Sequence, residues 1–149
     1  MRAVVQRVSE ASVLVDGEVV GAIGEGLVVL LGVARTDGSR EAERLAEKIA
    51  RLRLFDGEDG RMDVPLIDLG HDAAALCISQ FTLYGDVRRG LRPSFTEAAR
   101  GEQAESLYET FCEVLARQGV RVETGRFGAR MSVAMTNEGP VSLIVEMAP

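Results

Sequence analysis

The sequence predicts a β-rich α/β fold, a three-layer β/β/α arrangement of largely antiparallel, barrel-like sheets with two helices packed on one face. Three observations lead to this prediction. Many short apolar or alternating runs are separated by turn residues, as is typical of strands. Only two stretches carry apolar residues at helical spacing. Most connections are short, which favours antiparallel pairing. The length of 149 residues suits a single domain, 1–149, with one sizeable core.

The first part of the chain predicts four strands. Two are expected over residues 4–8 and 11–15, and a third over 18–23. Asp16-Gly17 separates the second from the third and favours a type I′ hairpin, because both residue types tolerate positive φ. The continuous apolar run 27–33 predicts a central strand buried on both faces.

Two helices are predicted. The first opens at Asp37-Gly38-Ser39 with Ser39 as its cap. Its buried face is formed by Ala42, Leu45, Ala46, Ile49 and Ala50. The second runs over 102–118 and stops at Gly119, a residue that suits the left-handed position after a helix. Its apolar stripe is formed by Ala104, Leu107, Tyr108, Phe111, Cys112, Leu115 and Ala116.

The remaining strands are short. Residues 52–55 are expected to be extended and to lead into the acidic turn 56–60, which lacks the length and the final glutamate of a calcium loop. Residues 120–123 predict a further strand. The runs 131–135 and 141–145 predict a last pair of strands.

Composition excludes several classes of protein. The chain is 46% hydrophobic and 27% charged, as in ordinary globular proteins. No apolar run approaches the ~20 residues that span a bilayer, and the N-terminus lacks a signal-peptide pattern, so we expect a cytoplasmic protein without membrane contact. The net charge of −6 and the pI near 4.9 argue against a general nucleic-acid binder. Cys77 and Cys112 are expected to be buried small hydrophobes, and His71, the only histidine, a surface loop residue.

Two stretches combine a strand with polar residues, and we expect them to meet at an active site. Residues 75–83 begin as an apolar strand and end with Ser79, Gln80 and Thr82. Residues 135–142 contain Asn137-Glu138-Gly139-Pro140, which fits either an ordinary hairpin turn or a cis Gly–Pro bond that directs carbonyls into a pocket.

The chemistry available to these residues is limited. The sequence has no zinc-ligand spacing, no P-loop and no dinucleotide fingerprint, so we expect no metal and no cofactor. A Ser79 or Thr82 hydroxyl without a nearby base is a weak nucleophile. An enzyme with this site should therefore act on an already activated bond through positioning and backbone donors.

These residues resemble a known family. The stretches Ser79-Gln80-Phe81-Thr82-Leu83 and 137–142 resemble the bacterial D-aminoacyl-tRNA deacylases, the D-tyrosyl-tRNA deacylase family. The likeness covers essentially the whole chain and includes Gln6-Arg7-Val8, the loop 90–95 and the segment 124–127.

The resemblance implies a hydrolase that cleaves the ester bond of D-aminoacyl-tRNA, and of glycyl-tRNA mischarged on tRNA-Ala. It implies a homodimer with two active sites at the subunit interface, and the 3′ acceptor end of aminoacyl-tRNA as the bound partner. The catalytic residues carried over are Gln80, Phe81 and Thr82. The substrate-binding residues carried over are Ser79, Gly139, Pro140, Met131, Phe127, Arg7 and Asn137.

In the family, a Gly–Pro with a cis peptide bond enters the pocket from the partner subunit. Its carbonyls hold the substrate amino group and leave no room for an L side chain, and Arg7 braces the segment. The arginines Arg88, Arg89 and Arg92 are expected to contact tRNA, with Arg126 and Arg130 as further positive charge around the site. Because no base is evident for Thr82, we expect water to attack with help from the 2′-hydroxyl of the terminal adenosine.

The sequence departs from the family pattern at three positions. Glu138 replaces an Asp, Ser142 replaces a Thr, and Asp63 replaces an Asn. The first two changes keep the polar character of the position, whereas Asp63 introduces a carboxylate. Two other functions remain open: a non-catalytic nucleic-acid-binding dimer, and a related deacylase of altered specificity.

Overall fold

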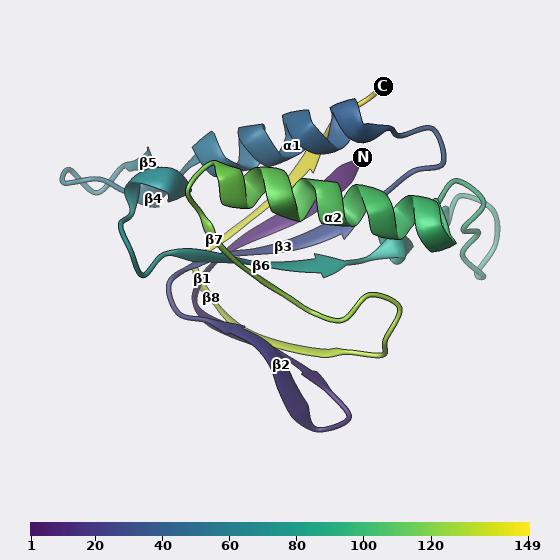
Figure 1. Ribbon diagram of the computed structural model, residues 1–149, viewed down its shortest axis with the longest axis horizontal. Coiled ribbons are helices and arrows are strands. Elements are labelled where there is room, and N and C mark those ends of the chain that lie inside the picture. Colours follow the sequence, from purple (N-terminus) through teal and green to yellow (C-terminus); the bar gives the residue numbers. More distant parts are fainter.

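The computed structural model describes residues 1–149 and confirms the β-rich α/β class (Figure 1). Along the chain the elements are β1 (Arg2–Val15), β2 (Glu18–Ile23), β3 (Gly26–Gly32), α1 (Ser39–Arg51), β4 (Arg53–Asp56), β5 (Met62–Pro65), the 3-10 turn η1 (Leu66–Asp68), β6 (Ala74–Ser79), the 3-10 turn η2 (Phe81–Tyr84), α2 (Gly101–Arg117), β7 (Arg121–Thr124) and β8 (Ser132–Glu146).

β1 organises the main sheet because it pairs antiparallel with three other strands. It pairs with β8 through residues 2–14, with two irregularities, with β3 through residues 2–8 and with β2 through residues 11–15. The two strands predicted over 4–8 and 11–15 are therefore one continuous strand. The polar residues Ser9 and Glu10 interrupt the apolar pattern, but Glu10 still pairs with Thr136. The hairpin at Asp16-Gly17 is confirmed, with φ of 51° and 77°.

The main sheet has the order β2-β1-β3-β6-β7, with β8 on the other side of β1. All ladders of β1 are antiparallel, as predicted, whereas β6 runs parallel to both β3 and β7. The two parallel pairs arise because α1 lies between β3 and β6 in the chain, and α2 between β6 and β7. A helical crossover returns the chain to the starting edge of the sheet, so the next strand runs in the same direction.

The sheet separates two apolar clusters. The larger has 27 buried residues and lies where α1 and α2 cover one face of the sheet side by side (Figure 1). The smaller has 8 buried residues, contributed only by strands of the curved sheet or their edges, among them Val13, Val28 and Leu76. This division gives the predicted β/β/α layers. Cys77 is buried and Cys112 is half-buried, and His71 is exposed in a turn.

The helix ends differ from the prediction in detail. Ser39 does not cap α1, because Gly38 occupies the N-cap position and its N–H donates to Glu41 Oε2 at 2.7 Å. In α2 the stripe includes Val114 and leaves Ala116 exposed. Gly119 follows α2 with φ of 94°, as expected for a residue that ends a helix.

β8 is one continuous strand and not two strands joined by a hairpin turn. Ser142 faces Gln6 and Asn137 faces Val8, so two steps along β1 correspond to five steps along β8. The extra residues form a bulge that contains Gly139, with φ of 127°, and the Gly139–Pro140 peptide bond is cis. The two halves of β8 lie end to end along β1, so they cannot also lie side by side as a hairpin.

Candidate active site

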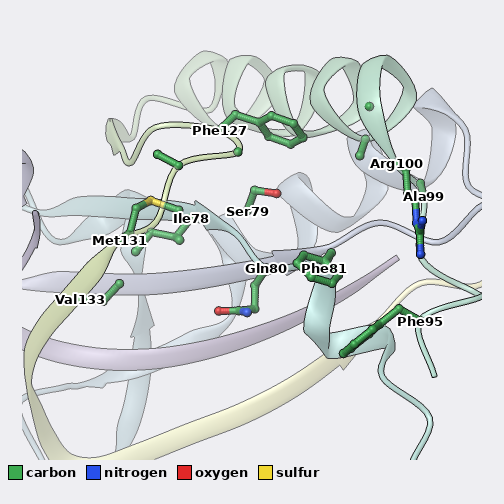
Figure 2. A pocket seen from close by; sticks show the side chains of 14 residues that line it. Ile78, Ser79, Gln80, Phe81, Phe95, Ala99, Arg100, Phe127, Met131 and Val133 are labelled. Atoms are coloured by element: carbon green, nitrogen blue, oxygen red, sulfur yellow. The ribbon is translucent and has the colours of Figure 1, made fainter. Parts of the chain in front are cut away.

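A pocket of about 610 Å³ opens where β6 ends (Figure 2). Its wall comes from the end of β6 and the start of η2, from the N-terminal end of α2 and from the loop between β7 and β8. Its lining residues are Ile78, Ser79, Gln80, Phe81, Phe95, Ala99, Arg100, Gly101, Ala104, Phe127, Gly128, Ala129, Met131 and Val133. The lining contains no Asp, Glu or His, and Arg100 is its only charged side chain.

The floor of the pocket is the junction between β6 and η2. The N–H of Gln80 donates to the Leu31 carbonyl at 2.8 Å, which fixes the end of the strand against β3. The hydrogen bond from Leu83 N–H to the Gln80 carbonyl closes the first turn of η2. The N–H groups of Phe81 and Thr82 come earlier in that turn and have no acceptor within it. They are therefore left available to other acceptors.

Thr82 lies beside the pocket and does not line it. Its hydroxyl oxygen accepts a short hydrogen bond from Gln80 Nε2. An amide N–H can donate a proton in a hydrogen bond but cannot remove one from a hydroxyl. The surroundings of Thr82 therefore do not activate it as a nucleophile.

Aromatic and thioether side chains form the rest of the wall. Phe81 packs edge-on against Phe95, with ring centroids 5.1 Å apart. Phe127 packs against Tyr108, with centroids 6.1 Å apart. Met131 lies so close to Gly125 that a Cβ at that glycine would come within 2.5 Å of the Met131 sulfur. The predicted residues Ser79, Gln80, Phe81, Phe127 and Met131 thus meet around one cavity.

Tyr108 connects α2 to the strand beneath the pocket. Its buried hydroxyl donates to the Cys77 carbonyl at 2.7 Å, two residues before Ser79. Burial raises the pKa of Tyr108 far above its ordinary value, so the phenol stays protonated and remains a donor at any physiological pH. This bond helps to hold the end of β6 in place under the pocket.

The Gly139–Pro140 segment does not line the pocket of its own chain. The Arg7 side chain contacts this segment: Nε donates to the Glu138 carbonyl at 2.9 Å, and Nη1 donates to the Leu54 carbonyl at 2.9 Å. Nη1 also contacts Asp56 Oδ1 at 3.2 Å. Gly139 and Pro140 themselves are exposed. Arg7 thus joins the bulge to the end of β4 through the Glu138 and Leu54 carbonyls.

Asn137 fixes the shape of the same bulge. Its Oδ1 accepts from the Val141 N–H at 2.8 Å, and its Nδ2 donates to Ser142 Oγ at 2.9 Å. A threonine hydroxyl at position 142 could accept the same hydrogen bond from Asn137 that Ser142 Oγ accepts. The other departure with a clear contact is Asp63, which pairs with Arg53 at 2.9 Å on the β4–β5 hairpin. The side chain of Glu138 is exposed, and nothing in the structure explains its replacement of Asp.

Arg88, Arg89 and Arg92 lie on an exposed loop beside the pocket. Asp86 and Ser94 close the base of this loop with two backbone hydrogen bonds of 2.8 and 2.9 Å. Arg88 is paired with Asp86 through Nη2 and Oδ2 at 2.7 Å. This guanidinium lowers the pKa of Asp86 to about 2. Arg89 and Arg92 form no ion pair within the chain.

Arg100 and the N-terminal end of α2 were not predicted from the sequence. This end borders the cavity through Arg100, Gly101 and Ala104, and its unpaired N–H groups add positive potential there. The available signal was an arginine directly before an amphipathic helix, which is too common to identify a site.

The fold and the pocket define the class of protein. Backbone donors, an apolar wall and an absence of acid–base pairs suit hydrolysis of an already activated ester, because such a bond needs positioning and charge stabilisation more than proton transfer. A family model described as D-Tyr-tRNA(Tyr) deacylase matches residues 4–146. The chain belongs to this family, whose members are hydrolases that act on aminoacyl-tRNA.

Individual relatives agree with this assignment. A D-aminoacyl-tRNA deacylase of Chloroflexus aurantiacus is 55% identical over 148 residues, which cover 99% of this chain and 91% of that protein. The deacylase of Thermus aquaticus is 56% identical over 146 residues, which cover 98% of this chain and 95% of that protein.

Two solved structures share the fold. One is titled c-Myc DNA Unwinding Element Binding Protein, with a TM-score of 0.91, 42% identity and 100% of both chains covered. The other, a probable eukaryotic D-amino acid tRNA deacylase, has a TM-score of 0.83 at 18% identity, covers 98% of both chains and supports the fold alone. No helix of this chain has both the length and the apolar character needed to cross a membrane.

Proposed function

We propose that two copies of this chain form the catalytic unit that hydrolyses D-aminoacyl-tRNA, with each pocket completed by Gly139 and Pro140 of the partner subunit. The observation that carries this proposal is the division of the site within one chain. The pocket and its backbone donors lie at the end of β6, whereas the braced Gly139–Pro140 bulge is exposed and absent from the pocket lining. A second copy can bring the two parts together.

The surface of β8 supports such pairing. β8 is hydrogen-bonded only to β1, so its other edge is open. Val133, Leu143 and Ile144 on this strand are exposed by 36%, 39% and 72%. An open strand edge with exposed apolar side chains favours association with another chain. In a two-fold dimer each subunit offers the same surface, so two equivalent sites result.

Handedness would be sensed by main-chain atoms. We propose that the carbonyls of Gly139 and Pro140 hold the substrate amino group. With the amino group and the ester carbonyl both held, the side chain and the hydrogen of the α-carbon can occupy only the two remaining positions. The D side chain then points into open space and the L side chain meets the bulge. Rejection by a rigid obstacle discriminates more strongly than a few extra contacts. Glycine has no side chain to reject, so glycyl-tRNA should also be hydrolysed.

The ester would be cleaved without a protein base. The N–H groups of Phe81 and Thr82 are proposed to bind the ester carbonyl oxygen and to stabilise the negative charge that develops on it. Water adds to the carbonyl carbon, its proton passes by way of the 2′-hydroxyl of the terminal ribose, and the 3′ oxygen leaves with a proton. Gln80 positions Thr82 and η2 through its side-chain hydrogen bond.

Thr82→Ala should keep substantial activity. The variant removes the hydroxyl but keeps the backbone N–H, so we expect kcat to fall by less than about 10-fold, against the 10²–10⁴-fold typical for loss of a proton-transfer group. Single-turnover hydrolysis of D-tyrosyl-tRNA measures this. Abolished turnover in a correctly folded variant would instead identify Thr82 as the nucleophile.

The decisive assay for the activity compares the two enantiomers. Purified protein is incubated with D-tyrosyl-tRNA and with L-tyrosyl-tRNA, and loss of the ester is followed. We expect rapid hydrolysis of the D form and little of the L form. Equal rates would contradict the chirality filter and favour a deacylase of altered specificity.

We also place the protein in the cytoplasm, with its tRNA substrate.

A second function has one observation in its favour. The similar solved structure at 42% identity is titled as a DNA-binding protein, which fits a non-catalytic nucleic-acid-binding dimer. The net charge of −6 weakens this alternative, because sequence-independent binding relies on positive charge. Retained RNA or DNA binding without loss of either ester would support it.

A further inference from the structure

A second hollow lies beside the active-site pocket, on the loop after η2. It has a volume of about 480 Å³ and its lining contains no apolar side chain. The lining residues are Asp86, Arg88, Arg89, Ser94 and Thr96. The backbone pairing of Asp86 with Ser94 fixes both sides of the hollow. In Figure 1 this loop is the teal segment beside the start of α2.

The groups around the hollow mostly offer hydrogen-bond donors. Arg88 is held in place by Asp86 through three contacts: Arg88 N to Oδ1 at 2.9 Å, Nε to Oδ1 at 2.9 Å and Nη2 to Oδ2 at 2.7 Å. Asp86 neutralises the charge of Arg88, so Arg89 remains as one uncompensated positive charge. The hydroxyls of Ser94 and Thr96 lie 3.4 Å apart and can each donate. Such a set suits a singly charged oxyanion.

The position of the hollow relates it to the substrate. Phe95 lines the active-site pocket and packs on Phe81 (Figure 2), whereas its neighbours Ser94 and Thr96 line the hollow. Consecutive Cα atoms lie about 3.8 Å apart, so the two cavities are separated by one segment of backbone.

We propose that this hollow binds a backbone phosphate of the last nucleotides of the tRNA 3′ end while the terminal aminoacyl-adenosine occupies the active-site pocket. The inference rests on the proposed function. Arg89 supplies the charge, Ser94 and Thr96 donate hydrogen bonds, and the Asp86–Arg88 pair holds the loop open. One phosphodiester, read without base contacts, allows the same enzyme to accept many tRNAs.

The test compares a substrate with phosphates and one without. D-tyrosyl-tRNA and D-tyrosyl-adenosine are hydrolysed by wild type and by Arg89→Ala. We expect the ratio of kcat/KM for tRNA to kcat/KM for the adenosine ester to fall about 5- to 10-fold in the variant. The slope of log KM for tRNA against log salt should fall by about 0.7, the value for one phosphate contact on a single strand. Arg61→Ala, an exposed arginine on the β4–β5 hairpin, is the matched control.

A second variant should change KM for tRNA and its salt dependence in the opposite direction. Asp86→Asn leaves Arg88 uncompensated and raises the charge of the hollow by one, so KM for tRNA should fall and the salt slope should steepen. Misfolding cannot produce that outcome. An unchanged ratio and slope in Arg89→Ala, or an equal loss on both substrates, would overturn the proposal.

Further results distinguish failure of the phosphate site from failure of the proposed function. If wild type hydrolyses D-tyrosyl-tRNA and Arg89→Ala behaves identically, only the phosphate site is refuted. If wild type hydrolyses no D-aminoacyl ester, the proposed function itself is refuted. Inorganic phosphate at matched ionic strength is the third arm. We expect it to raise KM for D-tyrosyl-tRNA with wild type but not with Arg89→Ala. An equal effect on both proteins would show that phosphate acts outside the hollow and would contradict the proposal.

Discussion

Gly139→Ala should lower kcat/KM for D-tyrosyl-tRNA by about 100-fold or more, the scale expected when a reacting group is displaced by an ångström. Gly139 has φ of 127°, which L side chains rarely adopt. A Cβ there would lie 2.9 Å from Val141 Cγ2 and 3.0 Å from Arg7 Nη2. The bulge must therefore change shape, and the carbonyls proposed to hold the substrate amino group move with it. Single-turnover hydrolysis measures the effect.

The loss should come from the site and not from unfolding, because Gly139 is exposed on the strand surface. Gly119→Ala is the matched control. Gly119 also has positive φ, 94°, but a Cβ there meets nothing within 4 Å. It lies at the far end of the 17-residue helix α2, roughly 25 Å along the helix from the pocket. We expect that control to lose some stability and to keep its activity. Wild-type activity in Gly139→Ala would contradict a role for the bulge.

Arg7→Ala should be the second most damaging change, with kcat/KM reduced by about 10- to 100-fold. One guanidinium joins the Glu138 carbonyl on β8 to the Leu54 carbonyl and Asp56 on the β4 edge. Lysine cannot reproduce that fork, so Arg7→Lys should recover little activity. The assay is the same, with urea unfolding to correct for lost stability.

Two comparisons separate bracing from general stability. Arg53→Ala breaks the exposed ion pair with Asp63 on the same hairpin, and should change activity little because exposed pairs contribute about 0–1 kcal/mol. The double variant Gly139→Ala with Arg7→Ala should lose little more than Gly139→Ala alone, because both changes disturb one segment. Fully additive losses would show that Arg7 acts elsewhere.

Local pattern predicted most of the fold. The Asp16-Gly17 hairpin, the apolar faces of both helices and the central strand at Leu27 follow from turn chemistry and periodicity, which act over a few residues. The continuity of β8 did not follow, because it depends on pairing with β1, more than a hundred residues away in the chain. The capping of α1 by Glu41 was missed because Ser39 is the more common type of cap.

The site was predicted only in part for a similar reason. Polar residues that follow a buried strand identified Ser79 and Gln80, which line the pocket, and Thr82, which lies beside it. The resemblance added Phe81, Phe127 and Met131. The contribution of Arg100 depends on how α2 packs against the end of β6, which no local pattern records. The charges in the arginine loop were visible, but the neutralisation of Arg88 by Asp86 depends on the folded shape of that loop.

The central claim is that each pocket borrows its chirality filter from the other subunit, and subunit mixing tests it most directly. Gly139→Ala damages the bulge and leaves the pocket intact. Ala129→Trp fills the pocket from a half-buried loop position and leaves the bulge intact. Each variant alone should be nearly inactive on D-tyrosyl-tRNA, and light scattering should show each as a dimer.

The two variants are then unfolded, mixed in equal amounts and refolded together, and D-tyrosyl-tRNA hydrolysis is measured. If the site is shared, half of the dimers are mixed and each contains one intact site of two, so activity should return to roughly a quarter of the wild-type value. If each pocket uses its own Gly139–Pro140, the mixture will remain as inactive as its components, and the shared site is contradicted.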